Sequence, residues 1–341
     1  MGHRGWGVGV VLVGLALSPT AAFGSTAEVR TVGDGPGAAH GQLTITGQGA
    51  ERNAITITSA GLGRLLNGVV DAGAPLTGKL GQGPHLGCLI APLLNAGLCL
   101  GEAPDDGVVV DLGAGNDLLD ARGLAAADAV TRYDLGSGDD RLLGGPAAET
   151  ILPRGGADDV SGGPGIDSVQ FPGDQDVRVS LDGIADDGPD GHANIRPDVE
   201  NVLTGRGNDV LIGSDGPNVL GGGEEYAADP IGVDRIEGRG GNDVLSLGRG
   251  VADGGEGDDQ LQGGFFGGSG LLLGGPGNDR IEAHGTFSVD AGLGDDVIDS
   301  SYHSTLPVAA NDIVCGPGFD TVRANAIDTV ADDCEQVTRV N

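Results

Sequence analysis

The chain has 341 residues, of which 68 are glycine and only 3% are aromatic. It carries 50 acidic against 18 basic residues, a formal net charge of −32, which excludes nucleic acid and anionic membranes as partners because both bind through positive charge. The same charge opposes compaction of the chain, and divalent cations are the obvious remedy.

Residues 1–24 have the plan of a secretory signal peptide. A basic residue precedes an apolar run from Val8 to Leu17, and small residues follow, with candidate cleavage points after Gly24 or Ala27. The apolar run is shorter than the roughly 20 residues that a membrane-spanning helix needs. The sequence therefore predicts a secreted or cell-surface protein, with no membrane insertion after cleavage.

Residues 25–110 differ from the rest of the chain. The runs 42–46 and 54–58 alternate apolar residues with threonine, a pattern typical of half-buried strands. A short run of valines, 108–110, leads into the repeats described next. We expect a small β module that caps a repeat array, because a terminal repeat cannot bury both of its faces.

Between residues 112 and 322 the chain contains twelve copies of the phrase x-G-x-G-x-D-x-(apolar)-x. Position 6 is aspartate in ten copies, with Glu149 and Asn218 in the others, and position 8 is aliphatic in all twelve. Glycine permits a tight turn with positive φ, and the aliphatic residue suits a short buried strand. One isolated copy would indicate no more than a turn, since Asp and Gly favour turns. Twelve phased copies predict a repeat architecture.

The phrase resembles the hemolysin-type, or RTX, calcium-binding repeat, whose consensus is G-G-x-G-x-D-x-U-x; clear copies begin at Gly162, Gly254 and Gly274. The resemblance implies an all-β fold, a parallel β-roll (β-solenoid) whose coils each contain two nonapeptides. It also implies Ca²⁺ between consecutive turns, bound by position-6 side chains and turn carbonyls. Ca²⁺ prefers roughly six to eight oxygen ligands, which such turns supply. The implied ligands are Asp117, Asp140, Glu149, Asp158, Asp167, Asp209, Asp243, Asp259, Asp279, Asp296 and Asp320.

A coil of two nonapeptides predicts which ligands are neighbours. Asp140 and Asp158 are 18 residues apart, and so are Glu149 and Asp167, which predicts two ladders on opposite sides of residues 135–170. Other spacings depart from 18 residues.

Two spacings depart most clearly. Asp296 and Asp320 are 24 residues apart, and Asp209 is followed 18 residues later by Ala227 rather than by an acid. We expect those turns to bind calcium weakly or not at all.

Four cysteines in a chain predicted to be exported indicate two disulfides, for which three connectivities are possible. Sequence proximity favours Cys88–Cys99 and Cys315–Cys334. A zinc site is the rival interpretation, but the chain has no C-x-x-C pair, and only His85 lies within a few residues of a cysteine.

The predicted organisation has six parts. They are a signal peptide (1–24), an N-terminal β module or cap (25–110), a first β-roll block (111–170), an insert with a strand and an acidic loop (171–203), a second block (204–299), and a last repeat with a disulfide-closed cap (300–341).

The predicted function is calcium binding, with Ca²⁺ as a structural ion that folds the repeats outside the cell. No G-x-S-x-G or H-E-x-x-H motif is present, and acid pairs such as Asp258–Asp259 fit the repeat, with a solvated turn residue followed by a ligand. We therefore predict no enzymatic activity. Two alternatives stay open: a cell-surface adhesin or matrix scaffold whose roll binds a partner, and a secreted enzyme with an unrecognised site in residues 25–110.

Overall fold

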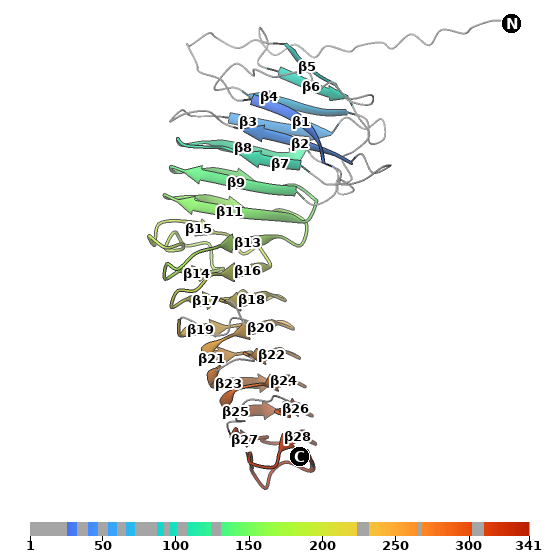
Figure 1. The fold of residues 1–341 in the computed structure, drawn as a ribbon, viewed down its shortest axis with the longest axis vertical. Coiled ribbons are helices and arrows are strands. Elements are labelled where there is room, and N and C mark those ends of the chain that lie inside the picture. The colour runs from blue at the N-terminus through green and yellow to red at the C-terminus, as the bar shows by residue number, and fades with distance from the viewer. Residues whose placement is uncertain are drawn as a thin grey trace, which may run out of the picture.

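The computed structural model describes side chains in residues 110–123, 132–223, 232–264, 268–301 and 310–340, and the backbone of the strands that precede or border these ranges. The predicted signal peptide lies outside the described residues. Three β-sheets form a tapering stack of coils, with the N-terminal strands at the wide end (Figure 1). No helix occurs in the described residues, and accordingly none there could span a membrane.

One sheet, called here the long sheet, runs the whole length of the stack. It has 14 strands. In spatial order they are β1 (Thr26–Val32), β2 (His40–Thr46), β7 (Val108–Asp111), β9 (Thr131–Ser137), β11 (Glu149–Gly155), β13 (Ser168–Phe171), β16 (Asn201–Thr204), β18 (Val219–Gly222), β20 (Val244–Leu247), β22 (Gln260–Gly263), β24 (Arg280–Ala283), β26 (Val297–Asp299), β28 (Thr321–Asn325) and β30 (Gln336–Val340).

Two sheets of 8 strands each complete the coils. The N-terminal short sheet contains β15 (Asn194–Ile195), β12 (Asp159–Ser161), β10 (Arg141–Leu143), β8 (Leu118–Gly123), β3 (Ala54–Ser59), β4 (Leu66–Asp71), β6 (Ala96–Leu100) and β5 (Gly87–Ala91). The C-terminal short sheet contains β14 (Arg178–Ser180), β17 (Val210–Ile212), β19 (Asp234–Glu237), β21 (Arg249–Asp253), β23 (Ser269–Pro276), β25 (Thr286–Leu293), β27 (Asp312–Val314) and β29 (Thr329–Val330).

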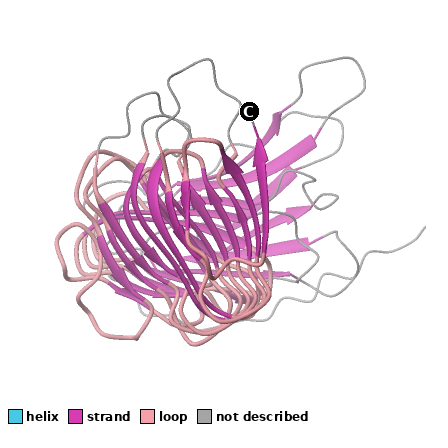
Figure 2. Ribbon diagram, turned by 90° about the horizontal axis from the view of Figure 1, so that it is seen from below, coloured by secondary structure: helices cyan, strands magenta, loops and turns pink. Residues whose placement is uncertain are grey.

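Successive repeats alternate between the long sheet and a short sheet. Strands β10 and β12 pair in parallel in the N-terminal short sheet, while β11 and β13 pair in parallel in the long sheet. One coil therefore contains two nonapeptides, as the phrase predicts. Viewed along the stack, the turns of successive coils lie over one another (Figure 2). The fold is the predicted all-β parallel roll.

The core follows from position 8 of the phrase. All twelve aliphatic residues at this position are at most 1% exposed. In the long sheet they lie in register from coil to coil, as with Leu245, Leu261 and Ile281. Burying one such side chain contributes about 1.5–3 kcal/mol, so the row of aliphatic residues favours stacking of the coils. They are Leu119, Leu142, Ile151, Val160, Val169, Leu211, Leu220, Leu245, Leu261, Ile281, Ile298 and Val322.

The N-terminal strands continue the roll with a different topology. Strands β1–β2, β3–β4, β4–β6 and β5–β6 pair antiparallel, whereas β2 pairs with β7 and β3 with β8 in parallel. The β module is thereby joined to the first coil through both sheets. The runs 42–46 and 54–58 form strands, as their alternation predicts.

The insert between the two blocks forms the seam between the two short sheets. Strand β15 ends one sheet and β14 begins the other. Asp187, which is fully buried, bridges them: its Oδ1 accepts the N–H of Ser180 (2.7 Å) and its Oδ2 accepts the N–H of Ile195 (2.8 Å). A residue that looks like part of a solvated acidic loop in the sequence is therefore a structural acceptor.

One of the two predicted disulfides is present in the described side chains. Cys315 and Cys334, 19 residues apart, are bonded at the C-terminal end of the roll. Closing a loop of this length stabilises a fold by about 3 kcal/mol. The register places Cys88 opposite Cys99 in the antiparallel pair β5–β6, but their side chains lie outside the described residues. The Cys88–Cys99 bond stays a prediction.

Candidate metal site

Position 6 of the phrase lies where each turn enters a strand, and there the side chains form ladders along both edges of the roll. The backbone N–H of one member donates to the side-chain oxygen of the next. Along the long sheet, for example, Asp243 donates to Asp259, and Asp259 to Asp279, each at 2.8 Å. The members of this long-sheet ladder are Glu149, Asp167, Glu200, Asn218, Asp243, Asp259, Asp279, Asp296, Asp320 and Glu335. The step from Glu200 to Asn218 differs, because there Nδ2 of Asn218 donates to the backbone carbonyl of Glu200 (3.1 Å).

The opposite edge contains a shorter ladder. Asp117 donates to Asp140 (2.7 Å) and Asp140 to Asp158 (2.9 Å); beyond the seam, Asp209 donates to Asp234 (3.0 Å). These residues are called here the short-sheet ladder. The eleven predicted ligands are thus divided between two edges, with the pairs Asp140–Asp158 and Glu149–Asp167 adjacent on opposite sides.

The hydrogen bond between successive ladder residues is present although the coils differ in length. It joins residues 16 apart at Asp243–Asp259 and 24 apart at Asp296–Asp320, so loops between the turns absorb the difference. Asp209 has Ala227, not an acid, 18 residues after it in the sequence. Its partner is Asp234, 25 residues later, because this coil is longer than 18 residues.

The phrase does not identify three of the ladder acids, because no G-x-G turn precedes them. Each nevertheless lies two residues before an aliphatic residue in a strand that continues the core register. The pairs are Glu200–Val202, Asp234–Ile236 and Glu335–Val337. An acid two residues before a strand aliphatic is therefore a signal that finds these three residues, although it also selects Asp312, which is exposed.

Many ladder carboxylates keep one oxygen unused. In the part of the chain that the structure describes, this oxygen is buried and accepts no hydrogen bond in seven of the predicted ligands. A buried charge without a partner costs several kcal/mol, so a carboxylate needs a cation or a proton there. The seven are Asp140, Asp167, Asp243, Asp259, Asp279, Asp296 and Asp320.

The unused oxygens face spaces that only glycine leaves open. An ideal Cβ at Gly254 would collide with Oδ2 of Asp259 and lie 2.6 Å from the carbonyl oxygen of Gly274 in the next coil. Gly238 has the same surroundings, formed by Asp243 and Gly254. A carboxylate oxygen and a carbonyl oxygen thus converge on one point between coils. Such hard oxygen donors fit Ca²⁺.

The electrostatics agree with a missing positive charge. Burial, together with the charges of Glu149, Glu200 and Asp198, raises the pKa of Asp167 to about 8. Burial likewise raises the pKa of Asp279 to about 7, with further contributions from neighbouring carboxylates. A cation bound at Asp167 or Asp279 would therefore compete with a proton for the carboxylate.

We expect the calcium-free roll to be more stable near pH 5 than near pH 8. Burial raises the pKa of Asp158 to about 6 and that of Asp167 to about 8, from roughly 3.9 for an unperturbed aspartate. The folded state therefore binds the protons more tightly, and this stabilisation, full below about pH 4, is lost as the pH rises to about 8. Thermal unfolding in chelator across this range measures the effect; a melting temperature that rises with pH would contradict it.

The short-sheet ladder stops in the second block. In register after Asp234 come Gly250, Gly270 and Phe287, none of which offers a side-chain oxygen. An ideal Cβ at Gly263 would lie 2.6 Å from the Phe287 ring, so the ring packs closely there. Apolar packing replaces carboxylates along this part of the edge.

Asn311 and Asp328 follow Phe287 on the same edge, and they are satisfied by hydrogen bonds. Asp328 accepts the N–H of Asn311 (2.9 Å), the N–H of Asn325 (2.8 Å) and the hydroxyl of Ser300 (2.8 Å). Both oxygens of this carboxylate have partners. Like Asp187, it is a structural acceptor rather than a metal ligand.

A second row of turn side chains lies on the surface, one residue before the ladder. Asn242, Asp258, Asn278 and Asp295 alternate from coil to coil, and the oxygen of each of the first three accepts the N–H of the next (3.1, 2.7 and 2.9 Å). In this row the N–H of the later coil donates to the earlier coil, whereas in the ladder the N–H of the earlier coil donates to the later one. Position 5 is exposed as predicted, but it also joins the coils.

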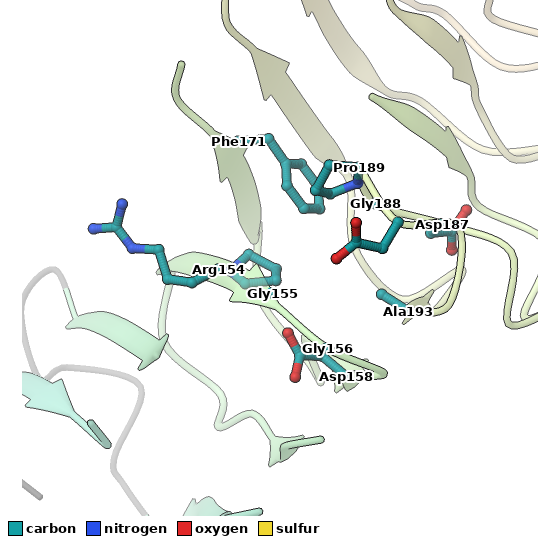
Figure 3. A pocket seen from close by; sticks show the side chains of 11 residues that line it. Arg154, Gly155, Gly156, Asp158, Phe171, Asp187, Gly188, Pro189 and Ala193 are labelled. Atoms are coloured by element: carbon teal, nitrogen blue, oxygen red, sulfur yellow. The ribbon is translucent and has the colours of Figure 1, made fainter. Parts of the chain in front are cut away.

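A small pocket lies at the seam, between the turn at Gly155–Gly156 and the loop Asp187–Pro189 (Figure 3). Asp158 and Phe171 contribute to its wall, and its volume is about 200 Å³ including the open mouth. Sites for small organic ligands are usually roughly 300–1,000 Å³. Its ionisable lining side chains are Arg154, Asp158, Asp187 and Asp190, and no histidine, serine or cysteine lines this pocket.

A parallel β-roll with buried carboxylates facing glycine turns is the architecture of a metal-binding repeat protein. Within that class, the chain carries RTX calcium-binding nonapeptide repeats, which are matched in four copies over residues 134–169, 199–225 and 231–251. The resemblance stated from the phrase is thereby confirmed. No curated protein matches the chain. The long-sheet ladder continues beyond the matched residues with the same hydrogen bonds, through Asp259, Asp279 and Asp296 to Asp320.

Proposed function

We propose that the protein is an exported calcium-binding protein in which Ca²⁺ folds and stabilises the roll. The observation that carries this proposal is the set of buried carboxylate oxygens that have no hydrogen bond and converge with turn carbonyls on glycine-lined spaces. Ca²⁺ would supply the positive charge that these oxygens lack. The ladder carboxylates would hold it, and the turn carbonyls would complete its shell.

Export and folding are linked in this proposal. With a net charge of −32, the chain resists compaction where calcium is scarce, as in a cytoplasm. Outside the cell, calcium binding becomes folding free energy, because the sites form only in the folded roll. The predicted signal peptide and the Cys315–Cys334 disulfide support an extracytoplasmic destination.

The test is a calcium titration of the mature protein, from residue 25, starting in chelator. We expect the β signal in circular dichroism to grow cooperatively with calcium, and calorimetry to count several equivalents per chain. Mg²⁺ is the control, because it demands a tighter octahedral shell and is expected to substitute poorly. A complete β signal in chelator, with no calcium uptake at millimolar concentration, would refute the proposal.

Nothing in the described residues favours either alternative. The enzyme alternative falls on residues 25–110, whose side chains lie outside the described part except for Val110, and the seam pocket is small and has no histidine, serine or cysteine in its lining. The adhesin alternative needs a partner that binds the roll in addition to calcium. The calcium proposal needs no such partner, so it is the simpler account.

A further inference from the structure

At the seam, one step of the long-sheet ladder is built differently from the repeats. Asp167 donates its N–H to Oε2 of Glu200 (2.8 Å), which lies 33 residues later in the sequence. The turn before Glu200 contains no glycine; it closes with a bond from the N–H of Val199 to the carbonyl of Arg196 (3.1 Å). The carbonyl that a repeat glycine supplies elsewhere must come from another residue here.

That residue is Asp198. An ideal Cβ at Gly162 would lie 2.6 Å from Oδ2 of Asp167 and 2.7 Å from the carbonyl oxygen of Asp198. Asp167 is completely buried, and its Oδ2 accepts no hydrogen bond, while its Oδ1 accepts the N–H of Glu149 (2.9 Å). The unused oxygen of a wholly buried carboxylate therefore points into the same space as the Asp198 carbonyl.

Asp198 also brings its own carboxylate. Its Oδ2 is fixed by the hydroxyl of Ser161 (2.6 Å) and the N–H of Gly163 (3.2 Å), whereas its Oδ1 is buried and accepts no hydrogen bond. The space at Gly254, between two repeats, has one unused carboxylate oxygen, which belongs to Asp259. The seam has two unused carboxylate oxygens, one from Asp167 and one from Asp198.

Among the side chains that the structure describes, no basic one bonds to Asp167, Asp198 or Glu200. Arg196, the nearest arginine in the sequence, directs its guanidinium to Asp159, with bonds of 2.7 and 2.8 Å. Within the described part of the chain, the carboxylates of Asp167, Asp198 and Glu200 thus lie at one turn without a hydrogen-bonded basic side chain, and the charge of Arg196 acts on Asp198 without a bond.

We propose that Asp167 and Asp198 form a cation site of their own, for a divalent ion of the calcium class, which fastens the insert to the first block. The site differs from the repeat sites because Asp198 lies outside the nonapeptide phrase and supplies both a carbonyl and a carboxylate. The affinity of calcium sites rises with ligand charge. The seam is therefore the first site to fill as calcium rises. This inference rests on the proposed calcium binding of the ladders.

The test compares Asp198→Asn with Asp174→Asn in the full mature chain. The Asp198→Asn variant keeps an oxygen for the Gly163 N–H but loses the charge, while Asp174 is exposed on the same insert and serves as the matched control. In calorimetric titration with calcium, we expect Asp198→Asn to lose the tightest equivalent, or to weaken it at least tenfold, with the other equivalents unchanged. Asp174→Asn is expected to bind as the wild type does.

A second variant separates binding from folding. Gly162→Ala removes no charge but fills the space on which the two oxygens converge, so it is expected to lose the same equivalent. Hydrogen exchange at residues 182–198 provides a further readout, because wild-type protection there should appear at the first calcium equivalent and be absent in both variants. Unchanged first-equivalent binding in both variants would overturn the seam site. A wild type that takes up no calcium would instead refute the proposed function itself.

Discussion

Replacing Gly257 by alanine is expected to destabilise the calcium-loaded roll by about 3 kcal/mol or more. The φ angle of Gly257 is 134°, a conformation that costs other residues about 1–3 kcal/mol. An alanine Cβ would also collide with the carbonyl oxygen of Gly241 in the preceding coil, and overpacking of this kind adds about 1–3 kcal/mol. Denaturant unfolding in saturating calcium measures the loss.

Substitutions at two other glycines distinguish the cost of the positive φ angle from the cost of the collision with the preceding coil. Gly173→Ala retains the strained angle, with a φ of 138°, but its Cβ would have nothing within 4 Å. Gly155→Ala has neither a positive φ nor a close neighbour. We expect an intermediate loss for Gly173→Ala and almost none for Gly155→Ala. If Gly257→Ala were no worse than Gly173→Ala, close approach between coils would not be the reason for glycine at position 4.

Asp259→Asn is expected to have opposite effects with and without calcium. Asp259 is 1% exposed, and its unused oxygen faces Gly254 and the carbonyl of Gly274. With calcium, losing this ligand should cost about 3–5 kcal/mol, the usual penalty for removing one partner of a buried ion pair. In chelator the same change removes a buried unpaired charge, so it should leave stability unchanged or raise it. Thermal unfolding under both conditions gives the two values.

The control is the neighbouring residue. Asp258→Asn removes the same formal charge from the exposed position of the same turn, and the new amide oxygen still accepts the N–H of Asn278. Its effect should stay within about 0.5 kcal/mol, as for most surface substitutions. Equal losses for the two variants in calcium would mean that total charge, rather than ligand position, governs the stability of the roll.

The roll and most of its candidate ligands were predictable because one phrase encodes both. Leu245 and Leu261 fall two residues after Asp243 and Asp259, so the same spacing sets the core and the ladder. Coil length was not predictable. Stacking requires only that the position-6 residue of one coil lies beside that of the next coil. The loops between them can differ in length, as the 25-residue separation of Asp209 and Asp234 demonstrates.

Residues outside the phrase depend on long-range register, which the sequence does not display. Asp187 stands in an acidic run that is typical of a solvated loop, and its burial follows only from the meeting of two sheets at the seam. Similarly, Gly250 and Phe287 carry no sign that they occupy the edge of the roll. Only the pairing of β19, β21, β23 and β25 places them in line with Asp234.

The surface row of Asn242, Asp258, Asn278 and Asp295 has a consequence for how this protein changes in length. Because amide and carboxylate alternate, the period along these four coils is two coils. Removing the single coil that carries Asn278 would bring Asp258 against Asp295, two like charges at adjacent positions, whereas removing a neighbouring pair preserves the alternation. Within these four coils, deletion or duplication in pairs is therefore the change that keeps unlike residues adjacent, and the alternation ends at Phe319, which donates its N–H to Asp295 (2.9 Å).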